Sequence, residues 1–182
     1  MFKIPRYRIA ALLCGLLLTT ACSAAGPDAS AAAPFTDGNQ YVTLAPPYTR
    51  DSDTGKVEVV EVFSYACIHC AEFSPYVDQL RKSLPADVAF KLVPAPFNDA
   101  WVPFARAYYA AKKLGLVEQT HDAMFIAKFK DQYPINSMDE IADFYAKHGA
   151  NRAEFLKIAN SPEVDAQIKK DLAMIQSWGV DG

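Results

Sequence analysis

The chain has 182 residues, a formal net charge of −3 and a hydrophobic fraction of 51%. This length is enough for one well-packed core but short for two independent domains, and the composition excludes a disordered chain. No run of basic residues stands out, which argues against nucleic acid or an anionic membrane surface as the main partner.

The first 21 residues have the layout of a secretory signal. Lys3, Arg6 and Arg8 precede an apolar run over residues 9–18, and small residues follow it. The run is short for a membrane-spanning helix, so a retained membrane anchor is the less favoured alternative. We therefore expect residues 1–21 to direct export, and their removal takes the formal charge from −3 to −6.

Cys22 leaves the processing of this signal open. The segment from Leu18 to Cys22 resembles a bacterial lipobox, in which the cysteine is lipidated and becomes the mature N-terminus, but Thr19 stands where leucine is usual. Ordinary cleavage among the nearby alanines is the competing interpretation. Residues 22–37 are rich in Ala, Ser and Pro and are predicted to form a flexible leader.

The next elements predict a strand–helix–strand unit. Residues 41–44 read as a short first strand, and residues 57–63 read as a second strand that is buried on both faces if it is central. Helical periodicity follows over residues 67–84, and residues 88–93 form another β-rich run. A unit of this length implies a parallel crossover.

From Trp101 onward the chain reads as helical. We expect residues 38–100 to form the first part of an α/β domain and residues 101–178 to form an all-helical insertion. The first two predicted helices cover residues 102–114 and 121–130. Three further helix starts are predicted from cap signals: the capping box of Ser137 and Glu140, Asn151, and Ser161 with Pro162.

Only Cys67 and Cys70 remain for the folded body, because Cys14 lies in the signal and Cys22 lies at its end. Exported proteins commonly use cysteines as structural crosslinks. A crosslink between residues three apart closes a very small loop and constrains the unfolded chain little. The pair therefore points to chemistry rather than to stability.

The position of the pair at a helix start favours redox chemistry. Unpaired N–H groups and the positive end of the helix dipole stabilise a thiolate at Cys67, the predicted nucleophile. Cys70, one turn deeper, is the predicted resolving thiol, and His69 can add a positive charge or a hydrogen bond.

Three other interpretations of the pair compete with redox chemistry. A zinc site needs about four ligands, but there is no second CxxC motif, and His121 and His148 lie far apart in the sequence. A purely structural disulfide and two inert buried thiols are the others. We expect no metal and no cofactor.

Three segments in order resemble the DsbA family of periplasmic disulfide oxidoreductases. In chain order they are residues 41–46, residues 59–73 around the CxxC motif, and residues 101–115. The resemblance runs from about residue 38 to the end. It implies an α/β, thioredoxin-like fold with an inserted all-helical domain.

The resemblance also implies a function and a site. Cys67 and Cys70, with His69, would donate a disulfide to reduced or unfolded exported proteins in the bacterial periplasm, and a DsbB-like quinone-linked membrane oxidase would reoxidise them. Glu61 matches a buried acid of the family and Lys91 its basic partner, a pair suited to relaying protons to Cys70. Without the resemblance, both residues read as charges that face solvent. A periplasmic reductase or isomerase, and a thioredoxin-like binding or chaperone module, are the alternatives.

Two departures from the family pattern stand out. Ile68 follows the first cysteine, where the family often has proline. Residues 179–182 match the start of the return to the thioredoxin-like domain, but the family's cis-proline loop, last two strands and final helix have no counterpart in the sequence. We therefore expect a C-terminally truncated fragment in which residues 57–63 form an exposed sheet edge.

Overall fold

The computed structural model describes residues 35–48 and 55–181. The predicted signal, Cys22 and most of the leader lie outside the described residues. The chain divides into two compact units, Met1–Thr43 and Leu44–Gly182. The predicted division of the second unit near residue 101 stays a prediction.

The described part of the first unit is a tight turn. Gly38 has a φ of 81° and brings Tyr41 beside Asp37, with which it forms an isolated β-bridge. The Thr43 N–H donates to the Asp37 carboxylate over 2.9 Å. The predicted strand over residues 41–44 is therefore wrong in this structure, because the local turn uses Tyr41 and Thr43 to close on Asp37.

The second unit contains the predicted strand–helix–strand unit. Strands β1 (Val57–Phe63) and β2 (Val88–Pro94) are parallel, and helix α1 (Ile68–Ser83) connects them. Within the described residues the sheet consists of these two strands. The register pairs Val60 with Lys91 and Glu61 with Leu92.

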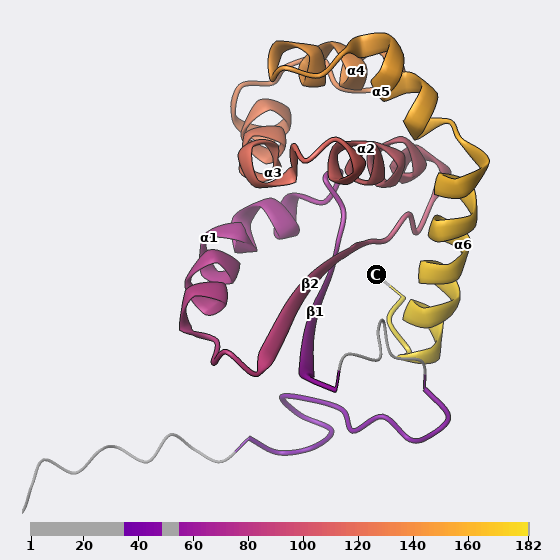
Figure 1. Ribbon diagram of the computed structural model, residues 1–182. Helices are drawn as coiled ribbons and strands as arrows, with labels where there is room; N and C mark the ends of the chain where they lie inside the picture. Colours follow the sequence, from indigo (N-terminus) through magenta and orange to yellow (C-terminus); the bar gives the residue numbers. More distant parts are fainter. Residues whose placement is uncertain (1–34, 49–54, 182) are drawn as a thin grey trace, which may run out of the picture. The chain divides into compact units, whose positions relative to one another are not determined.

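The two faces of the sheet are covered by different helices, α1 on one side and α6 (Pro162–Ser177) on the other (Figure 1). Because side chains alternate along a strand, Val60 and Val62 share a face, where they pack with Met174 and Ile175 of α6. Phe63 points to the opposite face and joins the larger core.

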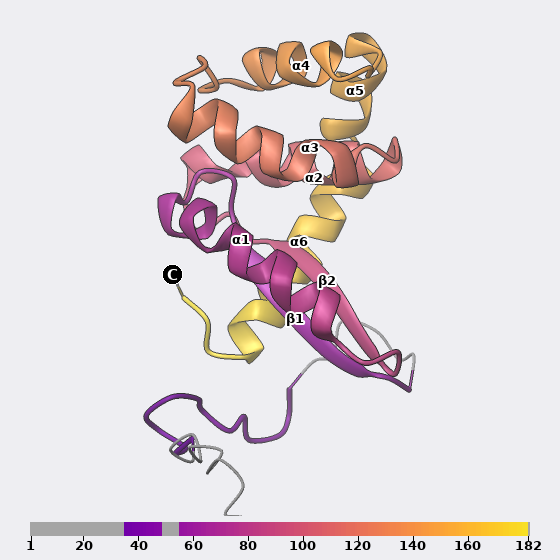
Figure 2. The same ribbon diagram turned by 90° about the vertical axis from the view of Figure 1, so that its left-hand side faces the viewer.

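The remaining helices stack beyond one end of the sheet, with α2 and α3 nearest to it and α4 and α5 outside them (Figures 1 and 2). Their aromatic and alanine side chains form one core with Phe63 and Tyr65. The bounds are α2 Val102–Lys113, α3 Val117–Phe125, α4 Met138–Lys147 and α5 Arg152–Ala159. No helix in the described part of the chain has both the length and the hydropathy needed to cross a bilayer.

The predicted helix starts are confirmed at three caps. Glu140 N–H donates to Ser137 Oγ over 3.2 Å, and the Glu140 carboxylate accepts from the Ser137 N–H in return. Asn151 and Ser161 cap α5 and α6. The helix predicted over residues 121–130 begins earlier, at Val117, and its last five residues form a π-helical turn (Ile126–Lys130).

Candidate active site

A short turn carries the chain from β1 into α1. The Cys67 N–H donates to the Ser64 carbonyl over 3.0 Å, and the Ala66 N–H donates to Ser64 Oγ over 3.1 Å. Cys67 has extended backbone angles (φ −95°, ψ 115°) and is the N-cap of α1. The predicted placement of the motif at a helix start is therefore confirmed.

Both thiols lie at the first turn of α1. The sulfur of Cys67 accepts a hydrogen bond from the Cys70 N–H over 3.3 Å. Both cysteines are free and half-buried. No acidic residue lies in the first turn of α1.

Cys70 has the more apolar environment of the two. Burial, followed by the hydrogen bond with Cys67, raises the pKa of the Cys70 thiol well above its ordinary value. The negative charge of Glu61 adds to this rise. Cys70 therefore holds its proton at neutral pH in the reduced state.

Glu61 extends from β1 towards the α1 face. Its Oε2 is buried and has no hydrogen-bond partner. Burial raises the pKa of this carboxyl to about 7, although the Arg81 charge acts in the opposite direction. Glu61 is therefore a carboxyl that can both take up and release a proton near neutral pH.

The predicted pairing of Glu61 with Lys91 is wrong. Lys91 is opposite Val60 in the register, so its side chain lies on the α6 face, whereas Glu61 and its neighbour Leu92 lie on the α1 face. Lys91 Nζ pairs instead with Glu58, at 2.5 Å from Oε1. Glu58 is three residues before Glu61 and therefore on the other face of β1.

His69 is more exposed than the thiols. Its side chain is 88% exposed, and Nδ1 lies 3.4 Å from Oε2 of Glu72, one turn further along α1. The side chain is nonetheless part of the wall of the pocket that contains both cysteines. His69 therefore shares the pocket wall with the thiols, although most of its side chain faces solvent.

A pocket of about 470 Å³ opens beside the thiols. Cys67, His69 and Cys70 contribute to one part of its wall, together with Glu61 and Ser64. The rest is apolar and is formed by Val62, Phe63, Phe73, Phe97, Trp101 and Val180. Sequence reasoning did not identify Phe97, Trp101 or Val180. They come from different parts of the chain, and no local pattern indicates that they meet.

The two histidines considered as zinc ligands have other contacts. His121 Nδ1 lies 3.0 Å from the Tyr65 hydroxyl, and His148 Nδ1 lies 2.8 Å from the Phe144 carbonyl. Among the described residues, no group of three or more His, Cys, Asp or Glu side chains is arranged to hold a metal ion.

Comparison with known proteins gives consistent results. The family model described as the DSBA-like thioredoxin domain matches residues 99–182. The thiol:disulfide interchange protein DsbA of Burkholderia cepacia is 32% identical over 171 residues, which cover 94% of this chain and 80% of the relative. The DsbA of Azotobacter vinelandii is 33% identical, with 94% and 80% covered.

Solved structures show the same fold. The crystal structure of Pseudomonas aeruginosa DsbA superposes with a TM-score of 0.74 at 33% identity, covering 81% of this chain and 77% of that one. For the oxidoreductase DsbA of Xylella fastidiosa the TM-score is 0.64 at 41% identity, with 68% of each chain covered. These likenesses confirm the predicted thioredoxin-like fold.

Proposed function

The chain belongs to the DsbA family of thiol:disulfide interchange proteins and is a thiol:disulfide oxidoreductase; on this basis we propose that it donates a disulfide to newly exported proteins through Cys67 and Cys70. The observation that carries the proposal is the hydrogen bond from the Cys70 N–H to the Cys67 sulfur at the N-terminus of α1. It favours negative charge on Cys67, which is the sulfur that must leave in the final step.

The reaction starts from the oxidised Cys67–Cys70 disulfide. A substrate thiolate attacks Cys67, the Cys67–Cys70 bond breaks, and Cys70 takes both electrons of that bond and then a proton. A second substrate thiolate attacks the substrate sulfur of the mixed disulfide, and Cys67 leaves as a thiolate. The substrate gains one disulfide, and the protein ends with two reduced cysteines.

Glu61 is our candidate for the proton donor and acceptor of Cys70. Its carboxyl titrates near neutral pH, and its charge acts on the Cys70 thiol. A protonated Glu61 can supply the proton that the leaving Cys70 thiolate needs, and it can recover one when Cys70 is reoxidised. Lys91 lies on the other face of the sheet, beside Glu58.

The apolar pocket fits an unfolded substrate. A reduced exported protein exposes apolar side chains near its cysteines, and Phe73, Phe97 and Trp101 offer a surface to receive them. Like its relatives, the protein is proposed to act in the bacterial periplasm, where a DsbB-like membrane oxidase would restore the disulfide.

The test uses the purified protein and a reduced test protein whose activity depends on a disulfide. We expect wild type to oxidise the test protein, Cys67→Ser to be inactive, and Cys70→Ser to accumulate a mixed disulfide with an oxidised substrate. Equilibration with glutathione separates an oxidase, which is readily reduced, from a reductase, which keeps its disulfide. Unchanged oxidation by Cys67→Ser would favour a binding module.

A further inference from the structure

Tyr65 anchors the turn that carries the reactive thiols. It lies two residues before Cys67 and is only 1% exposed. Its hydroxyl is 3.0 Å from Nδ1 of His121 in α3, 56 residues further along the chain. A side-chain hydrogen bond therefore ties the turn before Cys67 to the helical part of the protein.

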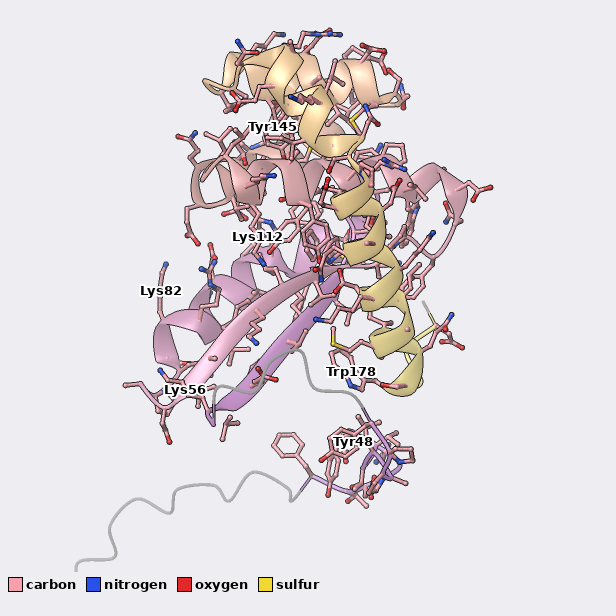
Figure 3. All side chains as sticks on the ribbon, turned by 45° about the vertical axis from the view of Figure 1, so that its right-hand side comes forward. Tyr48, Lys56, Lys82, Lys112, Tyr145 and Trp178 are labelled. Carbon is pink, nitrogen blue, oxygen red and sulfur yellow. The ribbon has the colours of Figure 1, made fainter. Side chains whose placement is uncertain are left out.

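The surroundings leave these two side chains little freedom. The His121 ring contacts Phe63 and Phe125, with centroids 5.1 and 5.3 Å away, and the Tyr65 ring contacts Phe125 at 5.2 Å. Tyr145, which Figure 3 labels between α4 and the helices nearer the sheet, belongs to the same core. Losing the Tyr65 hydroxyl would leave Nδ1 of the buried His121 without this hydrogen bond.

A second tie lies on the other side of the motif. Ser74, four residues after Cys70, donates its hydroxyl to Oδ1 of Asp122 over 2.6 Å. Asp122 directly follows His121, so neighbouring residues of α3 hold the chain before and after the CxxC motif. The Ser74 hydrogen bond holds α1, whereas the Tyr65 hydrogen bond holds the turn that orients Cys67.

We propose that Tyr65 and His121 are positioning residues for Cys67, and that their hydrogen bond sets the redox equilibrium of the Cys67/Cys70 pair. The inference rests on the proposed function. The bond holds the turn in the conformation in which the Cys67 sulfur accepts the Cys70 N–H. That contact stabilises negative charge on the sulfur and so favours the reduced form. Loosening the turn shifts the equilibrium towards the disulfide.

The test compares two buried tyrosines whose hydroxyls each take part in a hydrogen bond to another element. Tyr65→Phe removes the bond to His121, and Tyr108→Phe removes a bond of 3.1 Å to the Leu92 carbonyl in β2. With glutathione, we expect Tyr65→Phe to shift the equilibrium about fivefold towards the disulfide form, as expected for one lost hydrogen bond. Tyr108→Phe should remain within about twofold of wild type while losing comparable stability.

Variants of His121 keep the proposal testable if Tyr65→Phe folds poorly. In His121→Asn the amide oxygen takes the place of Nδ1 and can still accept from Tyr65, so this variant should stay close to wild type. His121→Leu should behave like Tyr65→Phe.

Equal equilibria for Tyr65→Phe and Tyr108→Phe, or for His121→Leu and His121→Asn, would overturn the inference. A wild-type protein that does not exchange disulfides would overturn the proposed function itself, so the two failures are distinguishable.

Discussion

Glu61 differs from the other carboxylates of the sheet through its neighbours. Glu58, on the opposite face of β1, has Lys91 as its partner, whereas Glu61 faces Leu92 and has a buried oxygen without a hydrogen-bond partner. Its pKa of about 7 results mainly from that burial. A carboxyl in this state costs stability when it is charged, but it is well matched to proton transfer at neutral pH.

Replacing Glu61 by glutamine should therefore slow the reaction and stabilise the protein. Without a titrating group beside Cys70, we expect the rate of thiol–disulfide exchange to fall roughly tenfold and to lose its pH dependence near pH 7. Stopped-flow measurement of oxidation of a reduced peptide between pH 5.5 and 8.5 checks this. Glu58→Gln is the control, since it alters the other face, and an equal loss of rate in that variant would contradict the relay.

The stability effect of the same change has a definite sign. The pKa of Glu61 rises from 4.5 to about 7 on folding, so the folded chain holds this proton more tightly than the unfolded chain. The resulting stabilisation is complete below pH 4.5 and is lost as the pH rises through 7. At pH 8, Glu61→Gln should be about 1–2 kcal/mol more stable than wild type in urea unfolding, a figure reduced for partial solvent access. Lower stability at pH 8 would contradict the burial argument.

At the scale of single elements, the local signals in the sequence were sufficient for much of the fold. The β-branched residues of β1 and the caps at Ser137, Asn151 and Ser161 act through neighbours a few residues away, so their effects could be predicted. The pairing of Lys91 could not, because it depends on a strand register that the sequence does not encode locally.

The capping box of α4 gives a direct test of this local control. Ser137→Ala removes the acceptor of the Glu140 N–H and should cost about 1 kcal/mol, which corresponds to a fall in Tm of roughly 2–4 °C. Differential scanning calorimetry measures it. Ser83→Ala is the control, because that hydroxyl is exposed and donates to the carbonyl of Leu80 in its own helix. A loss in Ser137→Ala no larger than in Ser83→Ala would show that the box contributes little.

At the scale of the whole second unit, the site depends on contacts between layers. The pocket wall combines Phe63 from β1, Phe73 from α1, Trp101 before α2 and Val180 after α6. The turn at Cys67 is held by His121 from α3. None of these contacts follows from spacing in the sequence, since each requires the packed arrangement. The position of the motif at a helix start was therefore predictable, whereas its surroundings were not.

His121 makes the packing of these layers sensitive to pH. Burial lowers the pKa of its imidazole, and the positive charge of Arg81 from α1 acts in the same direction. The negative charges of Asp122 and Glu118 from α3 and of Asp78 from α1 partly compensate. The unfolded chain takes up a proton near pH 6.5, and the folded chain resists doing so. The contribution of His121 is therefore complete above pH 6.5 and is lost as the pH falls.

His121→Asn should remove this sensitivity. The amide keeps an acceptor for Tyr65 but does not titrate. The difference in unfolding free energy between wild type and variant should therefore change between pH 7.5 and pH 5.5. The change is at most about 1.4 kcal/mol per pH unit. Urea unfolding at both values measures it, and comparison with wild type cancels the opposite contribution of Glu61. If the difference in unfolding free energy between the two proteins is the same at both pH values, His121 binds a proton as readily in the folded chain as in the unfolded chain. The argument from burial would then fail.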